Sequence, residues 1–298
     1  MSIQTASIGI VGCGIIGASW AQAFLRAGHT VVIFDPAVDT DELQSRMARD
    51  ATTDRLSVAT AIDGLAGCSY VQESIVEDAS AKRALFAQLD EILPGDTVVA
   101  SSTSALCMSD LVPNLAGRAR FLVAHPASPP HALPAVEIVP APFTGPECVE
   151  FTENLLRGIG QSPVRLAREV RGFALNRLQG ALLLAMIDLV RDGIVSPEGV
   201  DTLLRDSFAM RWSLMGPFEG VHLNAPGGID DYFTRYAEMF DGFCKDGQTL
   251  ADVLPQHVRD ALQAYGVSRV PLNEMEARRA WRDDALLALR DWRAGVTS

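Results

Sequence analysis

The sequence predicts an α/β protein, with a Rossmann-type doubly wound sheet over residues 1–167 and an all-helical C-terminal domain over residues 168–298. Short β-branched runs alternate with helical patterns up to residue 165, and this alternation is typical of a parallel sheet with helices on both faces. After Gly172 only helical patterns follow. A chain of 298 residues is also long enough for two domains of ordinary size.

The predicted strands are short and apolar, and helical patterns lie between them. The strands cover residues 7–11, 30–34, 69–72, 97–100, 121–124, 136–139 and 163–166. Helices are predicted at residues 16–27 and 80–92 within the first domain, and at residues 173–192, 196–207, 229–240, 250–264 and 273–292 within the second. The change from mixed to purely helical patterns places the domain boundary near Ala167 and Arg168.

Composition and charge narrow the classes of function. The 37 acidic residues outnumber the 25 basic ones, and the net charge of −12 disfavours binding to nucleic acid or to an anionic membrane surface. The five cysteines include no CxxC pair, so we expect reduced thiols, a cytoplasmic protein and no metal site. The longest apolar run, residues 181–190, is too short to predict a membrane span.

A glycine-rich turn directly after the first predicted strand predicts a dinucleotide site. Gly12, Gly14 and Gly17 form a GxGxxG string that opens a helix, where they allow a tight turn, the approach of a pyrophosphate and close packing of helix on strand. Asp35 ends the second predicted strand, where its carboxylate can accept both ribose hydroxyls and would repel a 2′-phosphate. NAD is therefore expected rather than NADP. The alternative is a plain turn and an unrelated acidic residue.

A histidine and a glutamate are candidates for acid–base chemistry. His125 directly follows a predicted strand, at the edge where open α/β sheets bind ligands. Glu137 lies inside an apolar strand, where a buried carboxylate needs a partner. If they pair, the carboxylate fixes the tautomer of the ring and leaves its other nitrogen as a general base. A structural histidine at a turn and a solvent-facing glutamate form the open alternative.

Other polar residues allow two interpretations each. Ser102 and Ser104 follow the fourth predicted strand, where their hydroxyls could contact a substrate oxygen or the nicotinamide, or could cap a helix. Asn176 lies early in an apolar helix, either as a satisfied core amide or as a donor aimed into a cleft.

Six strings occur in order along the chain: GCGIIGASWA, FAQLDEILPGDTVVASSTSAL, HPASPPHALPAVEIVP, EVRGFALNRLQ, LVRDGIVSPEGVD and MRWSLMGPFEGVHLNAPG. Together they resemble the 3-hydroxyacyl-CoA dehydrogenase superfamily, and within it the L-gulonate 3-dehydrogenase (lambda-crystallin) branch. The resemblance covers residues 6–36 and 70–240, together with ARRAWRDDALLAL near the C-terminus.

The resemblance implies roles for individual residues. It makes His125 the catalytic base and Glu137 its orienting partner, with Ser104 and Asn176 holding the reacting oxygen. It also implies a homodimer built through the helical domain, which binds the substrate. With the residues of the glycine-rich motif included, the expected cofactor contacts are Gly12, Gly14, Ile15, Ile16, Gly17, Asp35, Glu77, Lys82, Ser102 and Ser128.

Two features bear on the substrate. Acyl-CoA dehydrogenases of this superfamily carry a long helical excursion after the second strand, whereas here residues 36–69 are few, begin with acids and contain no lysine. Arg211 resembles an arginine of the sugar-acid and carnitine members and could clamp a free carboxylate, although a surface ion pair is the open alternative.

The expected function is NAD-dependent oxidation of a small, L-gulonate-like 3-hydroxy carboxylate to its 3-keto acid. The alternatives are a short-chain 3-hydroxyacyl-CoA dehydrogenase, a carnitine 3-dehydrogenase-like enzyme and a dinucleotide-binding structural protein.

Overall fold

A computed structural model describes residues 6–38, 43, 53–244 and 249–297. The chain forms two compact units, Met1–Leu184 and Ala185–Ser298, so the division falls inside helix α6 (Phe173–Arg191). The domain boundary predicted between residues 167 and 168 lies in the loop before this helix and stays a prediction.

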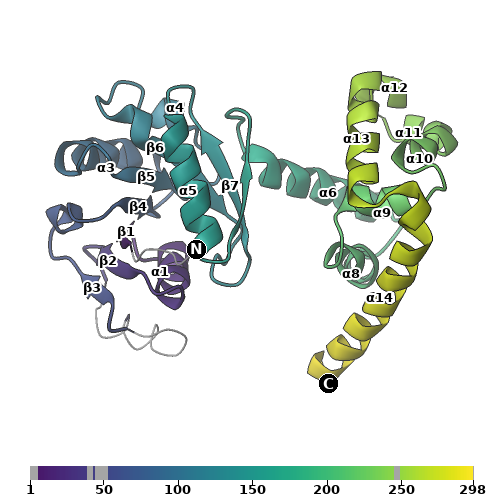
Figure 1. Cartoon of the computed structure of the whole chain (residues 1–298), viewed down its shortest axis with the longest axis horizontal. Helices are drawn as coiled ribbons and strands as arrows, with labels where there is room; N and C mark the ends of the chain where they lie inside the picture. Colours follow the sequence, from purple (N-terminus) through teal and green to yellow (C-terminus); the bar gives the residue numbers. More distant parts are fainter. Residues whose placement is uncertain (1–5, 39–42, 44–52, 245–248, 298) are drawn as a thin grey trace. The chain divides into compact units, whose positions relative to one another are not determined.

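One eight-stranded sheet organises the first unit (Figure 1). Its strands are β1 (Ser7–Val11), β2 (Thr30–Phe34), β3 (Leu56–Val58), β4 (Tyr70–Glu73), β5 (Val98–Ser101), β6 (Phe121–Pro126), β7 (Ala135–Pro140) and β8 (Ser162–Arg165). Their order is β3-β2-β1-β4-β5-β6-β7-β8, so the direction of winding reverses between β1 and β4. The predicted fold class is confirmed, and the short edge strand β3 is the one that the sequence analysis missed.

Strand β7 departs from the expected parallel pattern. It runs antiparallel to β6, whereas every other neighbouring pair of described strands is parallel. Only residues 127–134 join β6 to β7, and a connection this short forms a hairpin because a parallel crossover needs a dozen or more residues. As a result His125 lies directly opposite Glu137 in the ladder.

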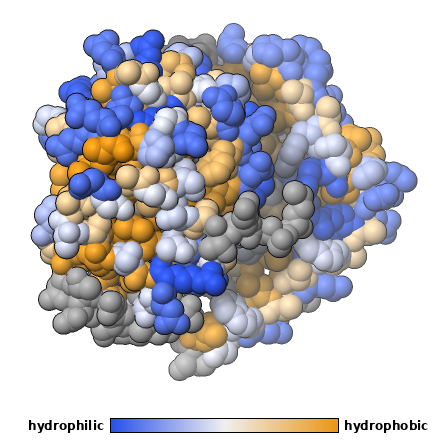
Figure 2. All heavy atoms as spheres, turned by 60° about the vertical axis from the view of Figure 1, so that its left-hand side comes forward, coloured by the Kyte–Doolittle hydropathy of each residue, from blue (hydrophilic) through white to orange (hydrophobic). Residues whose placement is uncertain are grey.

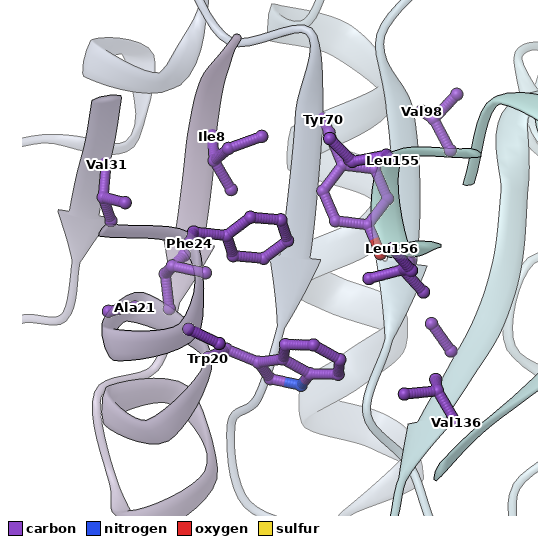
Figure 3. Close-up of a cluster of buried hydrophobic side chains, with 14 of the residues drawn as sticks. Ile8, Trp20, Ala21, Phe24, Val31, Tyr70, Val98, Val136, Leu155 and Leu156 are labelled. Atoms are coloured by element: carbon purple, nitrogen blue, oxygen red, sulfur yellow. The ribbon is translucent and has the colours of Figure 1, made fainter. Parts of the chain in front are cut away.

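Helices cover both faces of the sheet. Helices α1 (Ile15–Arg26) and α5 (Pro146–Gly158) pack on one face, over a core that includes Ile8, Trp20, Phe24, Tyr70 and Leu156 (Figure 3). Helices α3 (Ala79–Ile92) and α4 (Met108–Leu111) pack on the other face, over a core that includes Val71, Phe86, Val123 and Phe173. Because successive side chains of a strand point to opposite faces, two consecutive residues at the end of a strand lie on different faces of the sheet and have different neighbours.

The second unit consists of helices. They are α7 (Pro197–Leu203), the π-helical turn η3 (Leu204–Phe208), α8 (Ala209–Trp212), α9 (Pro217–Leu223), α10 (Ile229–Arg235), α11 (Ala237–Asp241), α12 (Leu250–Val253), α13 (Gln256–Arg269) and α14 (Met275–Thr297). The helix predicted at residues 196–207 continues without a break through the π-helical turn to Trp212, whereas the helices predicted at residues 229–240 and 250–264 are each divided. Pro255 accounts for the last break, because proline has no N–H to continue the helical ladder.

Helix α6 is apolar over most of its length. By length and composition it is the one helix in the described part of the chain that could cross a membrane, and little of it is buried. The apolar run at residues 181–190, which is too short by itself to predict a membrane span, is thus only part of a longer helix. Its exposed apolar side chains are those of Leu178, Leu182, Leu183, Leu184, Ile187 and Leu189. Apolar side chains also reach the surface on the face shown in Figure 2, where orange patches lie among hydrophilic residues.

Candidate active site

The glycine-rich turn joins β1 to α1, at the point where the winding reverses. Gly12 has a φ of +83°, and a Cβ atom there would lie 2.7 Å from the carbonyl oxygen of Ser74. A Cβ atom on Gly17 would lie 1.8 Å from the carbonyl oxygen of Gly12, so helix and strand touch backbone to backbone. A Cβ atom on Gly14 would have no described atom within 4 Å. The backbone at Gly14 is therefore open to a ligand.

A cavity of about 620 Å³ lies against this turn, and Asp35 forms part of its wall. One carboxylate oxygen of Asp35 accepts the N–H of Cys13 at 2.7 Å, and the other accepts the N–H of Ala37 at 2.9 Å. Each oxygen keeps acceptor capacity for a ribose hydroxyl. Ile15 and Val76, which also line the cavity, are 79% and 72% exposed.

These residues fit a dinucleotide. The start of α1 offers backbone N–H groups and a positive dipole end to a pyrophosphate. The Asp35 carboxylate suits a ribose, and the exposed apolar side chains suit the faces of a base. Within the described residues, no group of three histidines, cysteines or acids is placed to hold a metal ion.

His125 and Glu137 meet between β6 and β7. Nδ1 of His125 lies 2.8 Å from Oε2 of Glu137, and the two side chains are only 6% and 9% exposed. The other oxygen of Glu137 accepts the backbone N–H groups of Ala174 and Leu175, at 2.7 and 2.9 Å, in the first turn of α6. Glu137 is therefore a buried, three-fold hydrogen-bonded carboxylate and does not face solvent.

The protonation of this pair follows from its surroundings. Burial by itself raises the pKa of the Glu137 carboxyl, but hydrogen bonds from His125, Leu175 and Ala174 outweigh burial and hold this pKa below its ordinary value of 4.5. An ionised carboxylate can only accept, so Nδ1 of His125 must carry the proton that joins them. Nε2 of His125 makes no hydrogen bond to any residue that the structure describes, and it is the basic nitrogen of the neutral ring.

Phe173 holds the start of α6 against this pair. Its side chain is fully buried, and its ring centre lies 5.4 Å from that of His125. Its φ of +51° is rare for a bulky residue, and it follows Gly172, whose φ is +76°. This sharp turn brings the amides of residues 174 and 175 to Glu137. Sequence reasoning missed Phe173, for which the glycine at the helix start was the available signal.

Ser104 and Asn176 lie together. Nδ2 of Asn176 donates to the carbonyl oxygen of Ser104 at 2.7 Å, and the N–H of Ser104 donates to Oε1 of Glu77 at 2.9 Å. The main chain of Ser104 is thus held from both sides. Its hydroxyl is exposed and makes no hydrogen bond to a described residue. Asn176 directly follows Ala174 and Leu175, whose amides bind Glu137, so the first turn of α6 connects all four predicted catalytic residues.

Lys82 and Glu77 belong to an ion network on the α3 face of the sheet. Nζ of Lys82 lies 2.6 Å from Oε1 of Glu73, and these two side chains are 1% and 0% exposed. Nζ also lies 3.4 Å from Oε2 of Glu77, which is 43% exposed. Ser101 donates to the second oxygen of Glu73 at 2.5 Å. The Lys82 ammonium is therefore engaged inside the protein, and its contact with the cofactor stays a prediction.

The remaining predicted residues have different surroundings. The hydroxyl of Ser102 is hydrogen bonded inside the first unit, to Trp20, Gln72 and Ser74. Ser128 is exposed in the connection from β6 to β7. Arg211 lies on α8 in the second unit, half-buried, and its guanidinium has no ion pair or hydrogen bond to a described residue.

Comparison with known proteins identifies the family. Residues 7–170 match the model of the 3-hydroxyacyl-CoA dehydrogenase NAD binding domain, and residues 172–260 match that of the 3-hydroxyacyl-CoA dehydrogenase C-terminal domain. The chain belongs to the 3-hydroxyacyl-CoA dehydrogenase family. The resemblance seen in the six strings is thereby confirmed. This family member is an NAD-dependent oxidoreductase of the 3-hydroxyacyl-CoA dehydrogenase type, and its cofactor is NAD.

Relatives of this dehydrogenase cover nearly its whole length. The chain is 39% identical to the lambda-crystallin homolog of Bos taurus, over 95% of this chain and 94% of that protein. It is 33% identical to the L-carnitine dehydrogenase of Streptomyces griseus, over 91% and 93%. It shares its fold with the 3-hydroxyacyl-CoA dehydrogenase of Archaeoglobus fulgidus, with a TM-score of 0.75 at 21% identity over 96% and 99% of the two chains.

Gly14→Ala is expected to weaken NAD binding without lowering stability. The added methyl group meets no described atom of the protein, but it occupies the space through which a pyrophosphate approaches the backbone. We expect the Kd measured by titration calorimetry to rise about tenfold, which corresponds to about 1.4 kcal/mol. Gly17→Ala is the contrasting control, since its methyl group would overlap the Gly12 carbonyl oxygen and should lower the Tm. An unchanged Kd for Gly14→Ala would contradict this account of the turn.

Proposed function

We propose that this dehydrogenase oxidises the 3-hydroxyl of a small, L-gulonate-like 3-hydroxy carboxylate to the 3-keto acid, with His125 and Glu137 as the general-base dyad. The observation that carries the proposal is the 2.8 Å hydrogen bond between Nδ1 of His125 and Glu137, which leaves Nε2 without a described partner. The relative named L-carnitine dehydrogenase supports a small hydroxy acid as the substrate class, because carnitine is a free 3-hydroxy acid.

In the proposed mechanism His125 takes the proton of the substrate hydroxyl at Nε2. The ring becomes an imidazolium, and the ionised carboxylate of Glu137 stabilises that charge at Nδ1. Because two backbone amides hold Glu137, the carboxylate does not have to reorient when the charge forms. NAD, when bound, supplies the acceptor for the hydride that leaves the carbon.

Ser104 and Asn176 are proposed to hold the reacting oxygen. An amide side chain has two N–H donors, and Asn176 uses one of them on the Ser104 carbonyl oxygen. Its second N–H and the Ser104 hydroxyl are available to the oxygen of the substrate. Donors fixed in advance stabilise a developing alkoxide better than water does, since they need not reorganise during the reaction.

Arg211 is proposed to bind the substrate carboxylate. Its guanidinium is half-buried and has no described acidic partner, although acids outnumber bases by 12 in this chain. A planar guanidinium matches a free carboxylate with two parallel hydrogen bonds. The short acidic segment after β2, part of which lies outside the described residues, also favours a free acid over a CoA thioester.

The proposed assembly is a homodimer in which a second copy of this chain covers α6. Its exposed leucine and isoleucine side chains range from 37% to 71% exposed. A lipid bilayer is less suited than a second protein chain to cover α6, because the last turn of the helix carries an exposed ion pair between Asp188 and Arg191 at 2.7 Å. Sedimentation equilibrium should give a dimer at micromolar concentration. A monomer, or a chain soluble only in detergent, would contradict the assembly.

A substrate panel tests the proposed reaction. NADH formation is followed by its near-ultraviolet absorbance with L-gulonate, carnitine, 3-hydroxybutyrate and the CoA thioester of 3-hydroxybutyrate. We expect turnover with at least one of the free hydroxy acids and a higher kcat/KM for it than for the thioester. Turnover confined to the thioester would instead establish a short-chain 3-hydroxyacyl-CoA dehydrogenase.

His125→Asn is expected to abolish most turnover and to keep NAD binding. Removing a positioned general base lowers kcat by about 10²- to 10⁴-fold, whereas His125 does not line the cavity beside the glycine turn. The measurements are kcat from steady-state kinetics and the Kd for NAD. His257→Asn, on an exposed face of α13, is the matched control and should leave both unchanged. Full activity of His125→Asn would remove this residue from the mechanism.

Arg211→Met is expected to raise the KM for carboxylate substrates at least tenfold and to leave the KM for NAD unchanged. Methionine keeps much of the length of the side chain but cannot hydrogen bond a carboxylate. Arg205→Met is the matched control, because Arg205 is exposed and pairs with Asp206 at 3.0 Å. A substrate KM that stays the same in Arg211→Met, or rises equally in Arg205→Met, would end the clamp hypothesis.

A further inference from the structure

A chain of polar side chains runs from the core toward the cofactor cavity, on the α1 face of the sheet. Figure 3 shows two of its members, Tyr70 and Trp20, within the apolar cluster on this face. Tyr70 donates its hydroxyl hydrogen to Oε1 of Gln72 at 2.5 Å. Burial raises the pKa of Tyr70 well above its ordinary value, so the hydroxyl stays protonated. The chain continues through Ser102 to Ser74.

The orientation of the Gln72 amide is fixed by its neighbours. Its Nε2 lies 2.8 Å from the Ser102 hydroxyl oxygen and 3.4 Å from the carbonyl oxygen of Ala124. A carbonyl oxygen can only accept, so the group that faces Ala124 must be the NH₂ group. Gln72 therefore donates a hydrogen to Ser102.

Ser102 also receives a second donor. Nε1 of Trp20, which can only donate, lies 3.2 Å from the same hydroxyl oxygen. A hydroxyl oxygen has two lone pairs and one hydrogen, and Gln72 and Trp20 occupy both lone pairs. The third neighbour of Ser102 is Oγ of Ser74, at 2.8 Å. Ser102 must give its hydrogen to Ser74.

The hydroxyl of Ser74 is consequently left as a donor. It accepts from Ser102, and its own hydrogen meets no acceptor among the residues that the structure describes. Ser74 directly follows β4, its backbone lies against Gly12, and it lines the same cavity as Gly14 and Asp35. A half-buried donor in this position can give its hydrogen to an acceptor on a ligand in the cavity.

We propose that Ser74 is a further NAD-binding residue, whose hydroxyl donates to an acceptor oxygen in the ADP-ribose part of the cofactor. The glycine turn beside it is suited to the pyrophosphate and Asp35 to the adjoining ribose, and both groups present oxygen acceptors. Ser102 is then a positioning residue, which acts through Ser74 and fixes the direction of the hydrogen bond. The proposal rests on NAD as the cofactor and not on the identity of the hydroxy acid.

Ligand binding to Ser74→Ala tests the contact. Titration calorimetry with NAD and with ADP-ribose should show equal rises in Kd of about tenfold or more, because the lost bond reaches a group common to both ligands. Ser74→Thr keeps the hydroxyl and should restore most of the affinity. Ser69→Ala, directly before the other end of β4, is the matched control and should change neither Kd.

Two outcomes would overturn the assignment of Ser74. An unchanged Kd for both ligands would show that its hydroxyl binds no part of the cofactor. A rise for NAD without a rise for ADP-ribose would place the contact on the nicotinamide ring, which ADP-ribose lacks. Comparison of the Tm of each variant with the titration temperature ensures that folded protein is titrated.

A double-mutant cycle tests the part played by Ser102. Ser102→Ala should raise the Kd for ADP-ribose in the wild type but cause no further rise in the Ser74→Ala background, because its effect passes through Ser74. Equal rises in both backgrounds would show that Ser102 acts on the ligand independently, and would overturn its positioning role.

Discussion

The carboxylate of Glu137 is the group on which the candidate active site depends. A charge in this buried position is costly unless every lone pair that leaves water finds a donor. It finds three donors, from the imidazole of His125 and from the amides of Ala174 and Leu175. One side chain thereby joins a β-hairpin to the start of a helix. Through that helix it also sets the position of Asn176, and through Asn176 the main chain of Ser104.

The alternation of side chains along β4 and β5 creates two polar layers at one edge of the sheet. Glu73 and Ser101 point to the α3 face, where they meet the buried ammonium of Lys82. Gln72 and Ser102 belong to the α1 face, where Ser102 accepts hydrogen bonds from Gln72 and from the indole of Trp20. The first layer is ionic and supports Glu77, whereas the second is neutral and leads to Ser74. Two adjacent strands thus carry both layers, one on each face of the sheet.

Much of this arrangement could be predicted from the sequence. Short apolar runs between helical patterns predict the parallel strands. A carboxylate within an apolar strand needs a hydrogen-bond partner, and this requirement predicts the pair of Glu137 with His125. The hairpin was not predicted, since the apolar pattern of β7 does not show its direction. The burial of Lys82 was also missed, because a lysine on an amphipathic helix is ordinarily exposed.

The rest depends on packing that no local pattern encodes. The left-handed backbone of Phe173 becomes evident only from the fold, because the amides of Ala174 and Leu175 that it turns toward Glu137 meet a strand that lies far away in the sequence. The donor role of Ser74 depends on the order of five hydrogen bonds, which join Trp20 of α1, Tyr70 and Gln72 of β4 and Ala124 of β6 to the two serines that follow β4 and β5. Such a direction can be read only from the assembled structure.

The hydrogen bond from Cys13 to Asp35 couples coenzyme preference to the shape of the loop. A redesign toward the phosphorylated coenzyme would begin by removing the negative charge of Asp35. The same change would release the Cys13 amide, which lies between two glycines of the turn. Removing the charge is therefore not sufficient. The new side chain must also provide an acceptor at the place where Oδ2 of Asp35 now accepts the Cys13 N–H.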